Sequence, residues 1–395
     1  MKGILDATNV RITRLSPKDG NQYFFGYYDI PAFHPYKKLH LCHQVSFMDR
    51  LPELKDVCGL GVLDMGTGEF KELARTTAWN FQQGAMLQWN PLNYEEIIYN
   101  IYDNGNYRGM IKNIKTGAER RLDRPVTNVS PDGRWGLSVN MSRIYDFRPG
   151  YGYCNQKDPL AGVYIPGQDG VFLIDMQTGQ SKLILNYRQI NDALPQPWSP
   201  NKKIVINHIT FNRESDRFLF LVRVFPEADG EWKTALGTSD LHGNVYPLRP
   251  YAYASHYHWG IGGRLMIYGG WGNGAGLYIL QDETQQEERY DSPLFRKDIH
   301  CSYSPDGEWV IGDGYQDEKE YRPVYLYHIE SKQGMMIGRF HSPYPPITDI
   351  RCDLHCRWSP ESDAVSFDSI HEGFRGIYRM ELIDAMKEIR KLGGI

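Results

Sequence analysis

This chain of 395 residues has few of the features of a membrane protein or a nucleic-acid-binding protein. No apolar stretch is long enough to cross a bilayer, so we expect no membrane partner. The formal net charge of −4 supplies no basic face for phosphates, which argues against a nucleic-acid partner. The start, MKGILDATNV, lacks the hydrophobic segment of a signal peptide. We therefore expect a cytoplasmic protein, or a periplasmic or secreted one whose leader has been removed.

Cysteine is also scarce. The spacing of the six cysteines forms no regular framework; they are Cys42, Cys58, Cys154, Cys301, Cys352 and Cys356. Disulfide-rich secreted domains show dense and regular cysteine spacing. The sequence therefore predicts mostly free, buried thiols.

What the sequence does contain is a repeat. A short apolar strand, a turn and a second strand recur seven times, at FHPYKKLHL, QWNPLNYEEIIYN, NVSPDGRWGLSV, TFNRESDRFLFLV, HWGIGGRLMIYG, SYSPDGEWVIGDG and RWSPESDAVSFDS. Gly, Asn and Asp at the turns supply the positive φ angles that tight hairpins need. Antiparallel units at a spacing of roughly fifty residues predict an all-β fold, a seven-bladed β-propeller.

Radial repetition explains the whole chain, residues 1–395, as one domain. One interval is long, and we interpret residues 148–200, rich in Tyr, Gly, Pro and Gln, as a loop insertion on a binding face. The first strand, NVRITRL, is expected to pair into the last blade and close the ring. The C-terminal run IDAMKEIRKL is expected to form a short amphipathic helix that packs against the fold.

A histidine recurs at one fixed place in the last four repeats. His208, His256, His300 and His355 each lie five residues before the same position of the hairpin turn, which is proline in two of the four repeats. Side chains alternate between the faces of a strand, so a shared offset means a shared face. If these strands surround a common axis, the four imidazoles converge. This pattern predicts a functional site rather than four unrelated core histidines.

Imidazole is the commonest metal ligand and the usual proton-transfer group near neutral pH. In CDLH, Cys352, Asp353 and His355 can present a thiolate, a carboxylate and an imidazole, and Asp353 shares a strand face with His355. Together with His300 they form a candidate ligand set for a divalent metal ion. Zn²⁺, Mn²⁺ and Ca²⁺ all remain open as the ion. Asp298 is a further acidic residue near this set in the sequence.

Two of these motifs resemble a known family. HCSYSPDGEWVIGDG and DLHCRWSPESDAVSF are similar to the last blades of oligogalacturonate lyases, seven-bladed propellers that cleave uronate chains by β-elimination with a bound metal and a histidine base. The resemblance implies that His300 and His355 bind the metal and that His256 is the base. Asp353 stands where that family has a further histidine, and Ile350 where it has a glutamine ligand. Because Ile350 cannot replace the glutamine ligand, the neighbouring Cys352 is the candidate to take its place.

Other stretches resemble a sister group of propellers that includes ulvan lyases and a rhamnosidase that removes L-rhamnose from glucuronate. They are FFGYYDIPAF, AWNFQQGAMLQWNP, DFRPGYGY, NHITFN, DRFLFLVR and RCDLHCRWS. The ulvan-lyase resemblance implies Tyr145 as a catalytic tyrosine, but no histidine occurs between His43 and His208 to supply that group's histidine pair. The rhamnosidase resemblance implies one histidine on the opposite face of the propeller, with His43 as the candidate unless Gln44 occupies that position.

We therefore expect a polysaccharide lyase that acts on a uronate-containing oligo- or polysaccharide. His256 would take the proton from C5, His208 would be a second base or a ligand, and Tyr145 the acid. Arg223 would pair with the substrate carboxylate, because a planar guanidinium group can donate two parallel hydrogen bonds to a carboxylate. In the insertion, Tyr151, Tyr153 and Tyr164 would offer stacking surfaces for sugar rings.

Two other functions stay open. A rhamnosidase-like glycoside hydrolase would depend on His43, although no pair of carboxylates stands out for a conventional hydrolase. A non-catalytic propeller that binds glycan would need neither set of residues, because a fold does not by itself establish a function.

Overall fold

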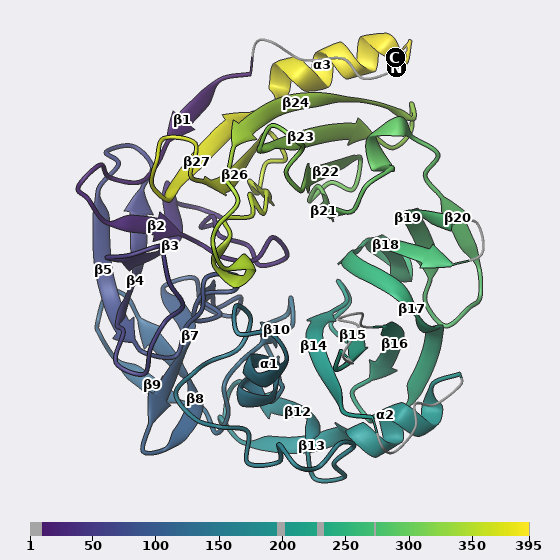
Figure 1. The fold of residues 1–395 in the computed structure, drawn as a ribbon. Helices are drawn as coiled ribbons and strands as arrows, with labels where there is room; N and C mark the ends of the chain where they lie inside the picture. Colours follow the sequence, from purple (N-terminus) through teal and green to yellow (C-terminus); the bar gives the residue numbers. More distant parts are fainter. Residues whose placement is uncertain (1–9, 196–201, 227–232, 272–273, 395) are drawn as a thin grey trace.

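The structure is a computed structural model, and it describes residues 10–195, 202–226, 233–271 and 274–394. Almost all of its regular structure is β-strand, and the sheets stand around a common centre like the blades of a propeller (Figure 1). The expectation of a propeller built from β-sheets is therefore confirmed. The chain runs around the ring once, so sheets that are neighbours in sequence are neighbours in space.

Antiparallel strands build the first three sheets, each by successive hairpins. The first contains β2 (Gln22–Phe24), β3 (Leu39–Val45), β4 (Cys58–Asp64) and β5 (Phe70–Thr76). The second contains β6 (Gln88–Trp89), β7 (Glu96–Asp103), β8 (Asn106–Asn113) and β9 (Glu119–Arg121). The third contains β10 (Asn128–Val129), β11 (Trp135–Ser138), β12 (Gly170–Asp175) and β13 (Ser181–Asn186).

A seven-stranded sheet follows. Its strands are β14 (Ile204–Phe211), β15 (Arg217–Val224), β16 (Thr234–Asp240), β17 (Val245–Trp259), β18 (Arg264–Trp271), β19 (Gly274–Gln281) and β20 (Glu287–Arg289). The first part of β17, 15 residues long, pairs with β16, and its last part pairs with β18. This one long strand therefore serves as the outer strand of one hairpin unit and the inner strand of the next.

The last two sheets close the ring. One contains β21 (Ile299–Tyr303), β22 (Trp309–Gly314), β23 (Tyr321–His328) and β24 (Gln333–His341). The other contains β25 (Arg357–Trp358), β26 (Ala364–Ser369), β27 (Gly376–Glu381) and, from the start of the chain, β1 (Ile12–Arg14). Since β1 pairs with β27, the prediction that the first strand completes the last sheet is confirmed.

Short helices lie outside the sheets. They are α1 (Met141–Phe147), α2 (Tyr187–Ala193), α3 (Ile383–Leu392) and the 3₁₀ turns η1 (Ile261–Gly263), η2 (Pro293–Phe295) and η3 (Thr348–Ile350). The helix α3 contacts β23 and β24 and buries Ala385 and Ile389, as predicted for an amphipathic helix that packs. Within the described ranges, no helix has the length and apolar composition needed to span a membrane.

The predicted insertion is shorter than the sequence suggested. Residues 148–200 include β12, β13 and α2, so the irregular segment is only residues 148–169, and residues 196–201 lie outside the described ranges. This segment turns inward, as the burial of Tyr151 and Tyr153 in the core shows. The prediction about cysteine is confirmed: all six are free, and all but Cys154 are buried.

Candidate metal and catalytic site in the central channel

A loop from the first sheet runs into the centre of the ring. Residues 25–32, here called the channel loop, follow β2 and reach toward the axis (Figure 1). The last sheet holds this loop, because Asp368 accepts hydrogen bonds from the backbone N–H groups of Phe25 and Gly26. Gly26 has a φ of 123°, and a Cβ there would lie 3.0 Å from the backbone of Gln83. The loop can approach this closely because the position is glycine.

The predicted convergence of histidines occurs around this loop. The ring centroids of His256 and His300 are 4.1 Å apart, and those of His300 and His355 are 4.4 Å apart. Tyr28 of the channel loop contacts all three rings. His208 stands on the other side of Tyr27, which stacks on it at 4.7 Å and contacts His355 at 4.9 Å. Three histidines are therefore direct neighbours, and the fourth joins them through a tyrosine.

The backbone reaches this arrangement by a different route from the one that strand alternation suggested. Only His300 lies in regularly paired strand, opposite Asp313. The pairing register shifts at His208 in β14 and around His256 in β17. Residues 351–356 are not strand, and His355 has a φ of 46°. Bulges and left-handed residues of this kind concentrate next to functional sites.

His300 and His355 are held in the way that protein metal sites hold their histidines. His300 Nδ1 lies 2.9 Å from Asp313 Oδ2, and His355 Nδ1 lies 2.8 Å from the carbonyl oxygen of Gly26. Each acceptor fixes the proton on Nδ1 and leaves Nε2 as a lone-pair donor. Both Nε2 atoms are buried without a hydrogen-bond partner. Burial lowers the pKa of both imidazoles well below the usual value, which keeps them neutral, as metal ligation requires.

Asp353 completes the set. Its Oδ2 lies 3.9 Å from Nε2 of His300 and 3.8 Å from Nε2 of His355, and ligand atoms of the three residues all lie within 4.8 Å of one another. Orphaned nitrogens that face a carboxylate fit a divalent cation. Neighbouring arginines compete for that carboxylate: Arg322 is 2.8 Å from Oδ1, and Arg351 is 2.6 Å from Oδ2. Burial opposes ionisation, but these guanidinium groups outweigh it and hold the pKa of Asp353 well below its usual value.

His256 is arranged as a base. Its Nδ1 lies 3.0 Å from Asp298 Oδ1, and Oδ2 of the same carboxylate accepts a hydrogen bond from the Tyr253 hydroxyl at 2.9 Å. An imidazole oriented by a carboxylate in this way can accept a proton at Nε2, and the carboxylate stabilises the imidazolium that forms. Tyr253 and Tyr315 are partly exposed beside this pair, while the ligand set is buried.

His208, Arg223 and Tyr151 form the opposite side of the site. The Tyr27 hydroxyl lies 3.1 Å from His208 Nε2, and the Gln83 amide lies 3.4 Å from Nδ1. Burial and the nearby Arg223 guanidinium lower the pKa of His208 well below its usual value. Tyr151 contacts His208 edge-on at 5.6 Å and accepts a hydrogen bond from Arg351. Tyr151 is therefore part of the site, but as a buried neighbour and not as an open stacking surface.

Three predicted residues lie apart from this arrangement. Cys352 is not among the grouped ligand atoms; it precedes Asp353 in a segment without regular secondary structure, and burial raises the pKa of its thiol to about 11. Tyr153 is fully buried, and its hydroxyl accepts a hydrogen bond from Asn100. Tyr145 is half-buried on α1 near Cys154, and none of its described contacts is with the four histidines. These placements correct the expectations that Cys352 is a ligand beside His300 and that Tyr153 is an open stacking surface, and they do not bring Tyr145 to the histidines.

His43 is also a core residue. It is fully buried in β3, its ring stacks on Phe24, and its Nε2 accepts a hydrogen bond from the backbone of Ala85. Burial lowers its pKa to about 3. The neighbouring Gln44 donates a hydrogen bond to the Tyr23 hydroxyl. The His43 ring is therefore engaged in core packing, and the Gln44 side chain is engaged by Tyr23.

Sequence reasoning missed several residues of the site. Tyr27 and Tyr28 of the channel loop, Asp313, Arg322 and Tyr315 carry no repeat signal of their own. Asp313 could have been found, because it lies in the strand that pairs with the His300 strand, in the same SPDG hairpin. The channel loop could not, since its path into the ring depends on anchors in the last sheet.

The fold and this site define a β-propeller with a buried histidine–carboxylate cluster at its centre. No family model and no curated protein matches the chain. Among solved structures it is similar to an oligogalacturonate lyase in complex with manganese, with 14% identity and a TM-score of 0.65, covering 95% of this chain and 94% of that one.

Two further solved structures are similar. An oligogalacturonate lyase from Vibrio parahaemolyticus has 15% identity and a TM-score of 0.63, and the match covers 95% of this chain and 94% of that one. A GH74 xyloglucanase from Xanthomonas campestris has 11% identity and a TM-score of 0.52, covering 92% of this chain and 53% of that one. The suspected resemblance to oligogalacturonate lyases is therefore confirmed at the level of structure.

Proposed function

We propose that this protein is a metal-dependent lyase that cleaves uronate-containing oligo- or polysaccharide by β-elimination. The proposal includes a seven-bladed count, obtained when the seven-stranded sheet is divided at β17. The observation that carries it is the pair of buried Nε2 atoms of His300 and His355, each directed at Asp353 by an acceptor on Nδ1. The oligogalacturonate lyases that the fold resembles add support.

His300, Asp353 and His355 would hold the ion. A divalent cation there supplies a Lewis acid that neutralises a uronate carboxylate and makes the adjacent C5 proton acidic. Mn²⁺ is the first ion to test, because the similar lyase structure contains manganese. Arg223, buried near Tyr27 and Tyr151, is a second cation for the carboxylate.

The proton transfer falls to His256. Its Nε2 takes the proton from C5 while Asp298 stabilises the resulting charge on the imidazole. The electron pair of the C5–H bond forms the C4–C5 double bond, and the C4–O bond breaks with its electrons on the leaving oxygen. A protonated group must then supply that oxygen with its hydrogen. The Tyr27 hydroxyl is our candidate, because it is hydrogen-bonded to His208 and its ring contacts that of His355 at 4.9 Å.

The test combines a binding and an activity measurement. Mn²⁺ alone is titrated into the metal-free chain by calorimetry, and galacturonate and glucuronate oligomers are then followed by the ultraviolet absorbance of an unsaturated product. We expect Mn²⁺ to bind, and the absorbance to rise only with metal. The His256→Gln variant should bind Mn²⁺ normally and lose turnover, whereas the exposed control His341→Gln should retain both. Binding without turnover on any uronate would refute the lyase, and no binding would refute the metal site.

A further inference from the structure

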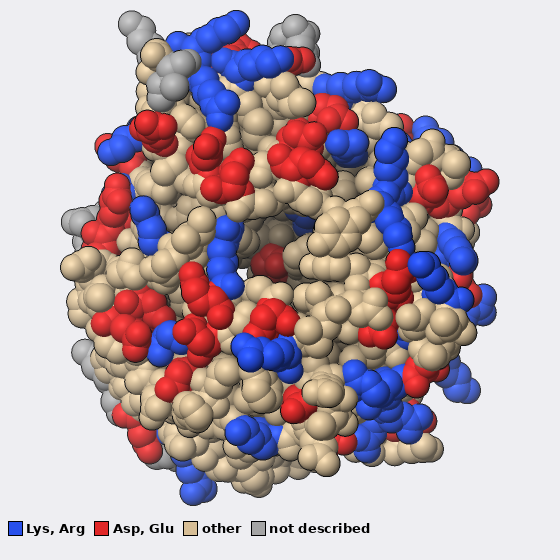
Figure 2. Space-filling model, turned by 180° about the vertical axis from the view of Figure 1, so that it is seen from behind, with Lys and Arg blue, Asp and Glu red and all other residues tan. Residues whose placement is uncertain are grey.

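A separate cavity lies on the other side of Tyr28. It has a volume of about 430 Å³, and its wall includes Tyr28 and Asp29 of the channel loop together with the hairpin ends of the inner strands. The molecule seen from behind Figure 1 is hollowed at its centre, and acidic atoms are visible inside the hollow (Figure 2). Neither His300, Asp353 nor His355 lines this cavity. It is therefore distinct from the site of the proposed lyase.

Aromatic side chains ring this cavity. They occupy equivalent positions, two residues before the same point of each hairpin turn, and are here called the aromatic collar: Phe33, Trp89, Phe211, Trp259, Tyr303 and Trp358. The seventh equivalent position is Val129. A cavity of this volume with apolar walls and few polar groups has the dimensions of a small-molecule site.

The indole N–H groups of the collar are already used. Trp89 donates to the carbonyl oxygen of Ala32 at 3.1 Å, and Trp259 donates to Thr210 at 3.0 Å. Trp358 donates to Ser302 at 3.4 Å. These bonds tie each tryptophan to a neighbouring segment. A molecule bound in the cavity would therefore contact mainly the ring carbon atoms of the collar.

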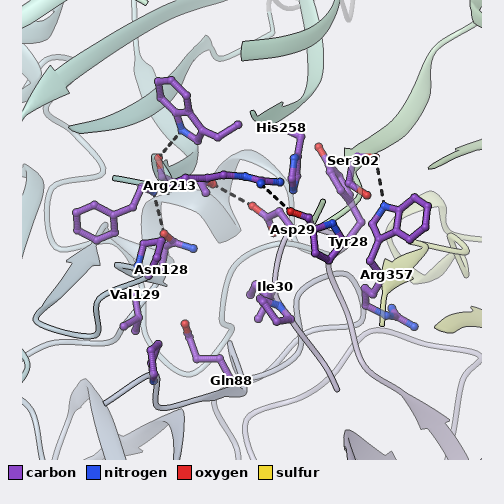
Figure 3. Close-up of a pocket in the computed structure, with 18 of the residues that line it drawn as sticks. Tyr28, Asp29, Ile30, Gln88, Asn128, Val129, Arg213, His258, Ser302 and Arg357 are labelled. Carbon is purple, nitrogen blue, oxygen red and sulfur yellow. Dashed lines mark hydrogen bonds between the residues drawn. The ribbon is translucent and has the colours of Figure 1, made fainter. Parts of the chain in front are cut away.

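Among the described residues of the wall, Asp29 is the one carboxylate (Figure 3). It lies deep in the protein, is partly exposed because it faces the cavity, and accepts a hydrogen bond from the Thr210 hydroxyl at 2.9 Å. Among the described residues, no lysine or arginine forms an ion pair with it. Burial raises its pKa to about 6, which reflects a carboxylate without a compensating cation.

The arginine and histidine side chains in the wall are engaged with other groups. Arg213 donates to the backbone oxygens of Ser304 and Pro305, and Arg357 donates to Asp368 at 2.7 Å. His258 accepts from the backbone of Tyr303, and burial lowers its pKa to about 3, so it carries no charge near neutral pH. The cavity therefore combines an uncompensated carboxylate with aromatic walls.

We propose that this cavity binds an organic ammonium ion, with its nitrogen on Asp29 and its hydrocarbon part against the aromatic collar. A cation satisfies the buried carboxylate, and ring faces attract cations through their quadrupole. A neutral ring would fill the same space and leave Asp29 uncompensated. An anion would face the same carboxylate at close range and be repelled.

The experiment measures binding of benzylammonium, benzyl alcohol and benzoate to the full chain by calorimetry, in the presence of a chelator. The three probes share a ring and differ in charge. We expect benzylammonium to bind about tenfold more tightly than benzyl alcohol, and benzoate not to bind. Asp29→Asn should abolish that preference. Asp384→Asn, which removes a surface carboxylate that is 83% exposed, should leave it unchanged.

A second variant guards against a change in folding at Asp29. Trp358→Leu removes one partly exposed ring of the collar and should weaken benzylammonium about threefold or more, as expected for one cation–π contact. Equal binding of benzyl alcohol and benzylammonium would overturn the proposal in favour of a neutral ligand. Benzylammonium binding that survives Asp29→Asn would overturn it as well. Because a chelator is present, these outcomes are independent of the metal site.

Discussion

The two ends of the central channel are built from the same strands and have opposite chemistry. In β21, His300 faces the ligand set at one end and Tyr303 faces the cavity at the other; in β17, His256 and Trp259 are divided in the same way. At the hairpin end, six of the seven equivalent positions are aromatic and the seventh is Val129, so the composition follows the repeat. At the other end, register shifts and a left-handed residue direct polar side chains inward. The residues of the proposed lyase site thus lie where the repeat is broken.

The channel loop separates the two ends. The Tyr28 hydroxyl donates to the carbonyl oxygen of Tyr257 and accepts from the Tyr257 N–H, so the loop is fixed to β17 at this point. Tyr28 faces the histidines, and Asp29 faces the cavity. The comparison predicts that changes at one end leave the other unaffected unless they disturb this loop.

The largest effect is expected from the ligand set. His300→Ala and His355→Ala should each lower Mn²⁺ affinity by more than about a hundredfold, because even the outer partners of metal ligands are worth about 10- to 100-fold. Calorimetric titration with Mn²⁺ measures this loss. Benzylammonium binding at the other end should remain, and His341→Ala should change neither. Unchanged Mn²⁺ affinity in both variants would show that the cluster is a hydrogen-bonded core.

A smaller loss of affinity is expected at Asp313. Asp313→Asn keeps the shape of the side chain but weakens the acceptor that fixes His300 Nδ1. We expect a decrease in Mn²⁺ affinity of about 10- to 100-fold. The matched change Asp306→Asn lies in the hairpin turn of the same sheet, away from the ligand set, and should not affect the titration. If the two variants bind Mn²⁺ equally well, the orientation of His300 does not depend on Asp313.

Gly26→Ala should break the independence of the two ends. The added Cβ meets the backbone of Gln83 at 3.0 Å, and φ is 123°. We expect a loss of about 1–3 kcal/mol in the free energy of unfolding, measured by urea denaturation. Because the Gly26 carbonyl oxygen is the acceptor for His355, Mn²⁺ affinity should fall too. Gly20→Ala, at a φ of 91° with open space around it, should cost less stability and leave Mn²⁺ binding intact.

The sequence was sufficient for the features that a periodic pattern determines. The hairpin repeats predicted the propeller, the pairing of β1 with β27 and the convergence of the histidines. Asp353 and His355 were expected together because alternate residues of a strand share a face. They do meet, but no strand is present there, and His355 has a positive φ. The conclusion held although the local structure assumed for it was wrong.

The remaining features depend on contacts that are distant in sequence. The residue type of Cys352 and its position next to Asp353 predict a metal ligand, yet the backbone does not bring it into the ligand set. Tyr153 and His43 look like functional side chains in sequence, but each is buried in a core. The channel loop is positioned by Asp368, more than three hundred residues away. A single sequence has no local signal for such a contact.

The remaining effect is expected at Asp29, and it disappears at low pH. Burial raises the pKa of this carboxyl from 3.8 to about 6, so the folded protein holds the proton more tightly than the unfolded chain. The ionised group therefore destabilises the fold, fully above about pH 6 and not at all below about pH 4. Asp29→Asn removes this penalty and keeps an acceptor for the Thr210 hydroxyl. We expect a gain of about 1–3 kcal/mol in the free energy of unfolding near neutral pH.

The gain should shrink as the pH falls, to about half at pH 5. Urea denaturation of the variant and the parent chain across this pH range measures it, and Asp384→Asn at the surface should show no such trend. Saturating benzylammonium should stabilise the parent more than the variant, because only the parent offers a carboxylate to the cation. If the gain in the free energy of unfolding does not change with pH, the pKa of Asp29 is not raised by folding. Asp29 would then not be a buried carboxylate that lacks a compensating cation. The cavity end would then lack the charge that distinguishes it from an ordinary apolar hollow.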